Sequence, residues 1–197
     1  MTDEKNHLRR QLLHARAEQS AADHERTDRR LMEQLRQWLD GFPTGSTVAA
    51  YVPAAEEPGG ALDFVDTLLA MPTVGQILLP ICPPGPPTAL HWGYYQGVLR
   101  PGRYGLLEPP NSLGPTGFCH ADIALLPAVA ADRRGFRLGR GAGYYDRSVE
   151  HTTAHRAALV FPHELVDEVP HDEHDQPVHT VISATEIVGT DTATRGV

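Results

Sequence analysis

Residues 132–147 constrain the fold of this chain more than any other segment. They read DRRGFRLGRGAGYYDR, with five arginines, two aspartates and four glycines, and they follow an apolar run at 123–126. Glycine tolerates positive φ, so several backbone N–H groups can turn toward one point, while Arg137 and Arg140 add charged forks that match phosphate oxygens. An apolar strand, this loop and a following helix predict a phosphate cradle in an α/β fold. A tight turn with solvated charges is the alternative interpretation.

Apolar periodicity along the rest of the chain predicts alternating helices and strands. Helices are predicted over residues 3–18, between the Ser20 cap and Gly41, over 62–70 and over 144–150. Strands are predicted over 47–52, 76–79, 123–126, 157–161 and 180–184, with Pro80 ending the second and a short hairpin over 91–95 and 97–99. This alternation indicates an open, mostly parallel sheet with helices on both faces. We expect a single domain over 1–188 and a flexible tail over 189–197.

The charge of the chain is unevenly distributed. The net charge is −8, yet residues 132–147 alone sum to +3, so the remainder carries −11. An acidic body with one basic segment favours a compact anionic ligand over a nucleic-acid backbone. No apolar run approaches the roughly 18 residues of a membrane-spanning helix, and Cys82 and Cys119 form no disulfide framework. We expect a cytoplasmic monomer that binds neither membrane nor nucleic acid.

Two motifs indicate a family. The order Arg-Leu-Gly-Arg-Gly-Ala-Gly-Tyr-Tyr-Asp at 137–146 resembles the signature of the 5-formyltetrahydrofolate cyclo-ligases, also called 5,10-methenyltetrahydrofolate synthetases. Lys5-Asn-His-Leu-Arg9 resembles the family's Lys-x-x-Leu-Arg pattern near the N-terminus, so the resemblance spans nearly the whole sequence. It implies an enzyme that uses ATP and Mg²⁺ to close 5-formyltetrahydrofolate, with or without a polyglutamate tail, into 5,10-methenyltetrahydrofolate. We infer that the formyl oxygen attacks the γ-phosphate to give an imidate phosphate, which N10 then displaces.

The resemblance also implies roles for individual residues. Arg140 and Lys5 are expected to act in catalysis, where phosphoryl transfer needs alignment and positive charge rather than a nucleophile. The residues expected to contact ATP are Lys5, Arg9, Arg137, Leu138, Gly139, Arg140, Gly141, Ala142, Gly143, Tyr144 and Tyr145. Those expected to contact the folate are Val52, Glu57, Arg140 and Tyr144. Asp146 and Asp175 are expected to hold Mg²⁺.

The chain departs from the family's pattern at two places. Relatives usually carry a single glutamate after the first strand, followed by an apolar residue, an acid and Thr, whereas this chain has Glu56 and Glu57 followed by Pro58-Gly-Gly. The match points to Glu57, with Glu56 as the alternative. His179 stands where relatives often carry an acid. Glu108, in a segment that resembles Gly-Ile-x-Glu-Pro, is a further candidate for contacting the substrate.

A stretch rich in histidine and acid at 171–175, followed by His179, leaves several interpretations open. A zinc site is one interpretation, because imidazole suits zinc, although the spacing fits no structural zinc pattern and no cysteine joins it. A solvated surface loop is a second, and the family resemblance supplies the third, a Mg²⁺ ligand at Asp175. Of the two adjacent tyrosines we expect one to be a core aromatic, and Tyr144 is the better functional candidate.

Other functional classes stay compatible with these residues. Phe136, Tyr144 and Tyr145 beside the arginines could stack RNA bases in a non-catalytic nucleotide- or RNA-binding protein, although the acidic remainder of the chain opposes this. The chain could also be another enzyme on a similar scaffold, such as a sugar-phosphate isomerase or an acyl-CoA-linked transferase, or an inactive family member. A requirement for ATP separates the cyclo-ligase from those other enzymes.

Overall fold

A seven-stranded sheet forms the centre of the protein, in a computed structural model that describes residues 2–150, 152–172 and 175–190. Its strands are β1 (Ser46–Ala49), β2 (Val74–Ile81), β3 (His91–Tyr94), β6 (Ile123–Pro127), β9 (His155–Leu159), β11 (Thr180–Ile182) and β12 (Ile187–Gly189). They lie in the order β12-β11-β9-β6-β1-β2-β3. The five strands from β11 to β2 are parallel, and the two edge strands are antiparallel to their neighbours. The predicted open, mostly parallel sheet is confirmed.

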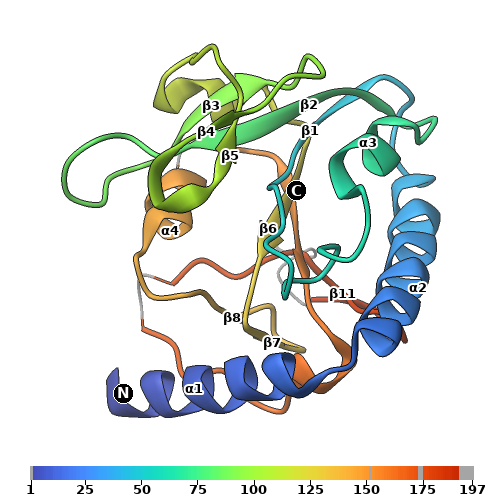
Figure 1. The fold of residues 1–197 in the computed structure, drawn as a ribbon, viewed down its shortest axis with the longest axis vertical. Coiled ribbons are helices and arrows are strands. Elements are labelled where there is room, and N and C mark those ends of the chain that lie inside the picture. The colour runs from blue at the N-terminus through green and yellow to red at the C-terminus, as the bar shows by residue number, and fades with distance from the viewer. Residues whose placement is uncertain (1, 151, 173–174, 191–197) are drawn as a thin grey trace.

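Side chains that alternate along the central strands build two apolar layers. In β6, Ile123 and Leu125 join a core cluster with residues of α2 (Ala21–Leu39) and α3 (Phe64–Leu69), whereas Ala124 and Leu126 join a cluster with Val149 of α4 (Tyr144–Val149). Figure 1 shows α2 and α3 on one side of the sheet and α4 on the other. Helices therefore cover both faces, as predicted.

The two N-terminal helices follow directly from sequence signals. Ser20 caps α2 by accepting a hydrogen bond from the backbone N–H of Asp23, and the helix buries the stripe of Leu31, Leu35 and Leu39 that the 3.6-residue period predicts. The first helix, α1 (Thr2–Glu18), packs Leu12 against β7 (Ala130–Asp132) and β8 (Arg137–Leu138). In Figure 1 it crosses the end of the molecule where these two strands lie.

Two smaller sheets lie beside the main one. One joins β7 to β8 and to β10 (Leu165–Val166), and the other pairs β4 (Arg100–Pro101) with β5 (Leu107–Glu108). Three short 3-10 helices complete the fold: η1 (Arg103–Gly105), η2 (Pro115–His120) and η3 (Pro162–Glu164). None of the helices in the described residues is long and apolar enough to cross a membrane.

The first part of the arginine-rich segment is a hairpin rather than a loop. The buried carboxylate of Asp132 accepts hydrogen bonds from the backbone N–H groups of Arg134, Phe136 and Val169, at 2.9, 3.1 and 3.0 Å. These bonds close the turn between β7 and β8. Of residues 132–147, only those from Arg137 to Asp146 line the cavity described below.

Two predicted strand features are wrong. β2 continues through Pro80 to Ile81, because the partner strand β1 ends opposite Leu78 and the missing N–H of proline costs no ladder bond there. The predicted hairpin over 91–95 and 97–99 does not form, since His91–Tyr94 instead pairs antiparallel with β2.

At the C-terminus, β12 ends at Gly189, one residue into the predicted tail. Residues 191–197 of that tail lie outside the described residues. Cys82 and Cys119 are not joined in a disulfide.

Candidate active site

A cavity of about 920 Å³ opens at the carboxyl ends of the parallel strands. Its walls come from α1, the loop after β1, the end of β2, the β4–β5 hairpin, the end of β6, β8 and the start of α4. Every residue that the sequence motifs singled out for ATP, folate or metal lines this one cavity. Segments as distant in the chain as Lys5 and Asp175 therefore meet at the edge of the sheet where α/β proteins bind ligands.

α1 presents two cationic side chains to the cavity. The Nζ of Lys5 lies 2.6 Å from a carboxylate oxygen of Asp172 and 2.7 Å from one of Asp175, and Arg9 Nε donates to the carbonyl oxygen of Gly139 at 2.9 Å. Burial opposes the charge on Lys5, but the bonds to both aspartates outweigh it and raise its pKa above the usual value. Burial likewise opposes the charge on Asp175, yet the hydrogen bond from Lys5 holds its pKa below normal.

A buried ion pair anchors α1 against the sheet. Arg16 donates to both carboxylate oxygens of Glu164 at 2.5 and 3.0 Å and to the carbonyl oxygen of Ala128 at 2.6 Å. Both charged side chains are almost fully buried, and the second carboxylate oxygen also accepts from the N–H of Phe161. The pair holds α1 at the carboxyl end of β6, so Lys5 and Arg9 have a defined position over the cavity.

Only two of the five arginines in 132–147 face the cavity. Arg137 on β8 is almost buried and donates to Asp146 at 2.7 Å, while its Nε is buried without a hydrogen-bond partner in the described part of the chain. An unpartnered buried donor in a cavity wall suits an anionic oxygen of a ligand. Arg133 instead pairs with Glu186, and Arg134 pairs with Asp132 and Glu168.

The glycines after β8 bring the backbone close to the cavity. Gly141 and Gly143 have φ of 101° and 70°, in the region that favours glycine, and the Arg147 guanidinium would lie 2.6 Å from a Cβ at position 143. Arg147 donates to the carbonyl oxygens of Ala142 and Gly143 at 3.1 and 2.8 Å, which holds the turn into α4. The φ values at 141 and 143 therefore favour glycine, and residues 139–143 all line the cavity.

Arg140 connects this loop to the acidic segment after β1. Its Nε donates to Glu57 at 2.9 Å and its Nη2 donates to Glu56 at 2.8 Å, so one guanidinium bridges both glutamates. Glu57 is the more buried of the two, and its other carboxylate oxygen accepts from the N–H of Ala54. The hydrogen bond from Arg140 lowers the pKa of Glu56. Burial opposes the charge of Arg140, but both glutamates keep its pKa above the usual value.

A buried carboxylate from α2 holds the Glu57 loop in place. Asp28 is fully buried and accepts hydrogen bonds from the backbone N–H groups of Gly59 and Ala61, each at 2.9 Å. His24, one turn earlier, lies 3.2 Å from the carbonyl oxygen of Glu57. Burial raises the pKa of Asp28, while the two backbone donors oppose that shift.

The Pro58-Gly-Gly segment, where the chain departs from the family's pattern, forms part of the same loop that Asp28 holds in place. A Cβ on Gly60 would lie 2.1 Å from the carbonyl oxygen of Ala54, and one on Gly59 would meet the Phe64 ring at 2.5 Å. These positions require glycine because the loop folds back tightly on itself. Glu57 still faces the cavity despite the departure.

Asp146 and Asp175 both line the cavity, each paired with a cation. Within the described residues no group of three or more His, Cys, Asp or Glu side chains gathers to hold a metal ion. Two carboxylates nonetheless suit Mg²⁺, which usually takes one or two from the protein and completes its shell with water and phosphate oxygens. The oxygen donors present fit Mg²⁺ and do not fit a structural zinc site.

The two tyrosines at the start of α4 differ in environment. Burial raises the pKa of the Tyr145 hydroxyl well above normal, and the ring packs against Trp92 of the core. The Tyr144 hydroxyl lies 3.4 Å from that of Tyr104, and this contact raises its pKa. Tyr145 is thus the core aromatic of the pair that the sequence predicted, although it also lines the cavity.

Sequence reasoning missed several residues of the cavity wall. These include Tyr51, Cys82, Leu90, Tyr104, Leu106 and Leu107. Tyr104, Leu106 and Leu107 come from the β4–β5 hairpin, a segment in which the family motif drew attention to Glu108 alone. The same hairpin contains Glu108, whose carboxylate accepts from the N–H of Cys82 at 2.9 Å. Glu108 therefore anchors the hairpin as well as lining the cavity.

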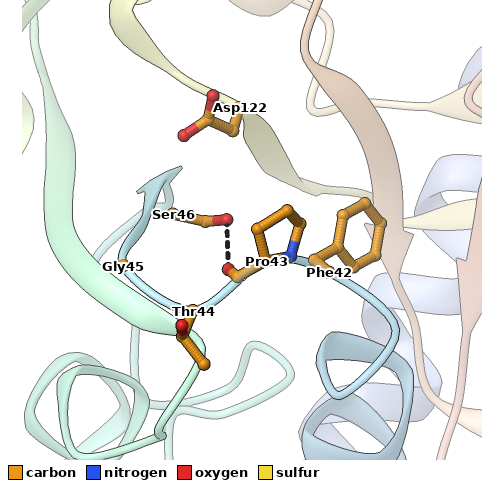
Figure 2. Close-up of a pocket in the computed structure, with 6 residues that line it drawn as sticks. All are labelled: Phe42, Pro43, Thr44, Gly45, Ser46 and Asp122. Carbon is orange, nitrogen blue, oxygen red and sulfur yellow. Dashed lines mark hydrogen bonds between the residues drawn. The ribbon is translucent and has the colours of Figure 1, made fainter.

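The opposite edge of the sheet has a smaller hollow of about 260 Å³, lined by Phe42, Pro43, Thr44, Gly45, Ser46 and Asp122. Figure 2 shows the Ser46 hydroxyl donating to the carbonyl oxygen of Pro43, with Asp122 across the hollow. Asp122 accepts from the N–H of Thr47 at 2.8 Å. His179 lies on this edge as well, where its Nδ1 accepts from the N–H of Arg156 at 2.9 Å. Among the described residues it is not part of the cavity wall.

Comparisons with known proteins agree with the motifs. The chain is 43% identical over 159 residues to the 5-formyltetrahydrofolate cyclo-ligase of Mycolicibacterium smegmatis, which covers 77% of this chain and 80% of the relative. It is 37% identical over 91 residues to the Mus musculus protein of that name, covering 43% of this chain and 42% of that protein. The solved structure of Aquifex aeolicus 5,10-methenyltetrahydrofolate synthetase matches with a TM-score of 0.75 at 23% identity, over 95% of this chain and 93% of that one, and it shows the shared fold.

The family model described as the 5-formyltetrahydrofolate cyclo-ligase family matches residues 1–184 of the chain. This match covers the whole cavity, from Lys5 on α1 to Asp175. The chain belongs to the 5-formyltetrahydrofolate cyclo-ligase family.

Proposed function

We propose that this protein uses ATP and Mg²⁺ to cyclise 5-formyltetrahydrofolate to 5,10-methenyltetrahydrofolate, releasing ADP and phosphate. The observation that carries the proposal is the meeting of α1, the Glu57 loop, residues 137–146 and Asp175 around one cavity of about 920 Å³. A cavity of this size lies near the upper end of the range of small-molecule binding sites, roughly 300–1,000 Å³.

We propose that the phosphates of ATP bind where cationic side chains converge beside the glycine loop. Lys5 and Arg9 reach this region from α1, and Arg137 presents its buried, unpartnered Nε from β8. Asp146 and Asp175 would hold Mg²⁺, which supplies positive charge to the phosphate oxygens. The present ion pairs of these residues are compatible with this role, because a bound anion can replace a carboxylate as the partner of Lys5 or Arg137.

The proposed reaction needs only alignment and charge from the protein. The formyl oxygen of the folate attacks the γ-phosphorus, the bond to ADP breaks, and an imidate phosphate forms. N10 then attacks the formyl carbon, loses its proton, and phosphate leaves with the former formyl oxygen. Arg140 is the residue best placed to contact both substrates, because its side chain extends from the glycine loop and donates a hydrogen bond to Glu57 in the loop after β1. Glu57, fixed by the N–H of Ala54, would orient the pterin.

We also propose that the protein acts as a cytoplasmic monomer on folates, with or without a polyglutamate tail, and does not bind nucleic acid. The net charge of −8 supports the last point, since the arginines are balanced by acidic partners on the described surface.

A spectrophotometric assay tests the proposed function. Purified protein is mixed with 5-formyltetrahydrofolate, ATP and Mg²⁺, and the near-ultraviolet absorbance of the methenyl product is followed. We expect absorbance to rise only when nucleotide and metal are both present. A flat trace from folded protein that binds ATP would reject the reaction and leave the cavity as a nucleotide site with another purpose.

A further inference from the structure

The two aspartates proposed to hold Mg²⁺ are supported in different ways. Asp146, in the first turn of α4, accepts from the almost buried side chain of Arg137 at 2.7 Å. Asp175 accepts from the Nζ of Lys5 at 2.7 Å, and Lys5 is also a cation that we propose for the phosphates of ATP. Once a phosphate takes Lys5 as its partner, Asp175 needs another support to stay directed into the cavity, because metal ligands depend on the groups that hold them in place.

The backbone of Asp172 provides the first part of that support. Its N–H group donates to a carboxylate oxygen of Asp175 at 2.8 Å, and the N–H group of Asp175 donates back to the carbonyl oxygen of Asp172 at 3.0 Å. Neither bond involves Lys5, so both can remain when Lys5 binds a phosphate. The direction of the Asp175 carboxylate therefore depends on where the chain at Asp172 lies, and His171 directly precedes it.

His171 is held by an aromatic contact that the proposed reaction does not use. Its ring stacks on that of Phe136, with the ring centres 3.5 Å apart and an angle of 14° between the planes. Its Nδ1 also lies 3.0 Å from the carbonyl oxygen of Val169, a fully buried residue. Phe136 and His171 are both half-buried, and neither belongs to the described cavity wall. The stack therefore acts on the chain around His171 rather than on a ligand in the cavity.

Phe136 itself has a fixed position on the β7–β8 hairpin. Its N–H group donates to the buried carboxylate of Asp132 at 3.1 Å, and the same carboxylate accepts from the N–H of Val169 at 3.0 Å. Phe136 directly precedes Arg137, the residue that pairs with Asp146. Two consecutive residues of one hairpin thus contact the supports of both proposed metal ligands, so a shift of the hairpin would move both.

We propose that Phe136 and His171 are positioning residues for the metal site. Their stacked rings hold residues 169–172 against the β7–β8 hairpin, so Asp175 stays directed into the cavity after Lys5 has turned to a phosphate. The inference rests on the proposed function and extends it to residues that touch neither the substrates nor the metal. Groups that support a metal ligand from behind contribute about 10- to 100-fold to metal affinity, which sets the scale of the expected effect.

The test measures how much Mg²⁺ strengthens the binding of ATP. The dissociation constant of ATP is determined by calorimetry with Mg²⁺ and again with EDTA, without folate, and the ratio of the two values reports the contribution of the metal site. We expect Phe136→Leu and His171→Ala each to reduce this ratio about tenfold and to leave the affinity in EDTA unchanged. The Mg²⁺ concentration that gives half-maximal turnover should rise by a similar factor. Phe136→Tyr keeps the stacked ring and should match the wild type in both measurements.

Phe42→Leu is the matched control. It also removes a phenylalanine ring that contacts a histidine, because the ring centres of Phe42 and His155 lie 5.3 Å apart, but this pair is at the opposite edge of the sheet. The control variant should lower the melting temperature about as much as Phe136→Leu and leave the ratio unchanged. A wild-type ratio in both Phe136→Leu and His171→Ala, or an equal loss of ATP affinity in EDTA, would overturn the positioning role while the proposed function stands. If the wild-type protein neither gains ATP affinity from Mg²⁺ nor converts 5-formyltetrahydrofolate, the proposed function fails and the positioning role fails with it.

Discussion

The two edges of the main sheet use polar residues in different ways. At the carboxyl edge, charged side chains from segments far apart in the chain meet across a large cavity and pair with one another, as Lys5 does with Asp175 and Arg140 with Glu57. At the amino edge, Asp122 and His179 accept hydrogen bonds from backbone N–H groups of neighbouring strands, and only Asp122 of the two lines a much smaller hollow.

The difference lies in what a ligand can replace. An ion pair between two exposed or half-buried side chains contributes little to folding, so a phosphate or carboxylate of a ligand can substitute for one partner at small cost. A side chain that binds the backbone of an adjacent strand cannot leave without exposing an unpaired N–H group. We therefore expect substitutions at the carboxyl edge to change activity and those at the amino edge to change stability.

The largest expected effect is that of Arg140→Ala on turnover. Removing the one guanidinium that bridges the glycine loop and the Glu57 loop should lower kcat roughly 10³-fold, the scale of an arginine that stabilises phosphoryl transfer. Arg133→Ala is the control, because Arg133 is exposed, pairs with Glu186 and lies outside the described cavity wall. Steady-state kinetics with both substrates give the answer, and a loss below about tenfold would remove Arg140 from the catalytic residues.

Asp28→Ala should produce the largest loss of stability, and it should also affect substrate binding, because Asp28 holds the loop that contains Glu57. The substitution leaves the buried N–H group of Gly59 and the partly buried N–H group of Ala61 without their acceptor, which should lower the free energy of unfolding by about 3 kcal/mol. The freed loop should also raise KM for the folate, while KM for ATP stays constant. Urea unfolding and steady-state kinetics measure the two effects. Glu33→Ala, on the exposed side of α2, is the control and should change neither stability nor KM. If the Asp28 variant keeps the wild-type KM for folate, Asp28 does not position Glu57.

Features that depend on neighbours in the sequence could be predicted, and features that depend on distant partners could not. The stripe of Leu31, Leu35 and Leu39 and the glycine turn at 139–143 each carry their signal within a few residues. No local signal in the sequence identifies the partner of His91–Tyr94, because this strand pairs with β2 across a proline-rich loop. Nothing near Arg16 in the chain predicts its burial against Glu164, 148 residues away.

The candidate site divides in the same way. Motif spacing brought Lys5, Glu57, the glycine loop and Asp175 to attention, and all of them line one cavity. Asp132 looked like part of the basic segment, but its carboxylate is buried in a backbone turn. Asp28 was missed because a lone aspartate in a helix has no pattern, and its importance comes from its burial beneath the Glu57 loop.

Lys5→Ala should weaken ATP binding by about 10- to 100-fold, the scale of one charge-assisted hydrogen bond. Lys5 faces the cavity from a helix that Arg16 anchors independently, so the fold should survive its loss. Titration calorimetry with ATP measures the change, with Lys5→Arg as the variant that keeps the charge and should recover part of the affinity. Nucleotide affinity equal to that of the wild type would place the phosphates away from α1.

The smallest expected effect is a dependence of stability on pH at the amino edge. Burial, together with the charge of Arg156, lowers the pKa of His179 to about 4, so the folded protein keeps the imidazole neutral while the unfolded chain protonates it near 6.5. The unfolded state therefore binds the additional proton between these values, and the free energy of unfolding should fall as the pH drops from 6.5 toward 4. Because His179 is only half-buried, we expect a loss of about 1–2 kcal/mol.

His179→Asn isolates this effect, because the asparagine oxygen can still accept from the N–H of Arg156 but does not titrate. Urea unfolding at pH 7 and pH 5 should show a smaller difference for the variant than for the wild type. Some difference should remain, since burial also lowers the pKa of His155. His7→Asn on exposed α1 is the control and should behave like the wild type. At pH 7 the turnover of His179→Asn should equal that of the wild type, because His179 lies at the edge opposite the cavity, and a large loss of activity there would contradict the separation of the two edges.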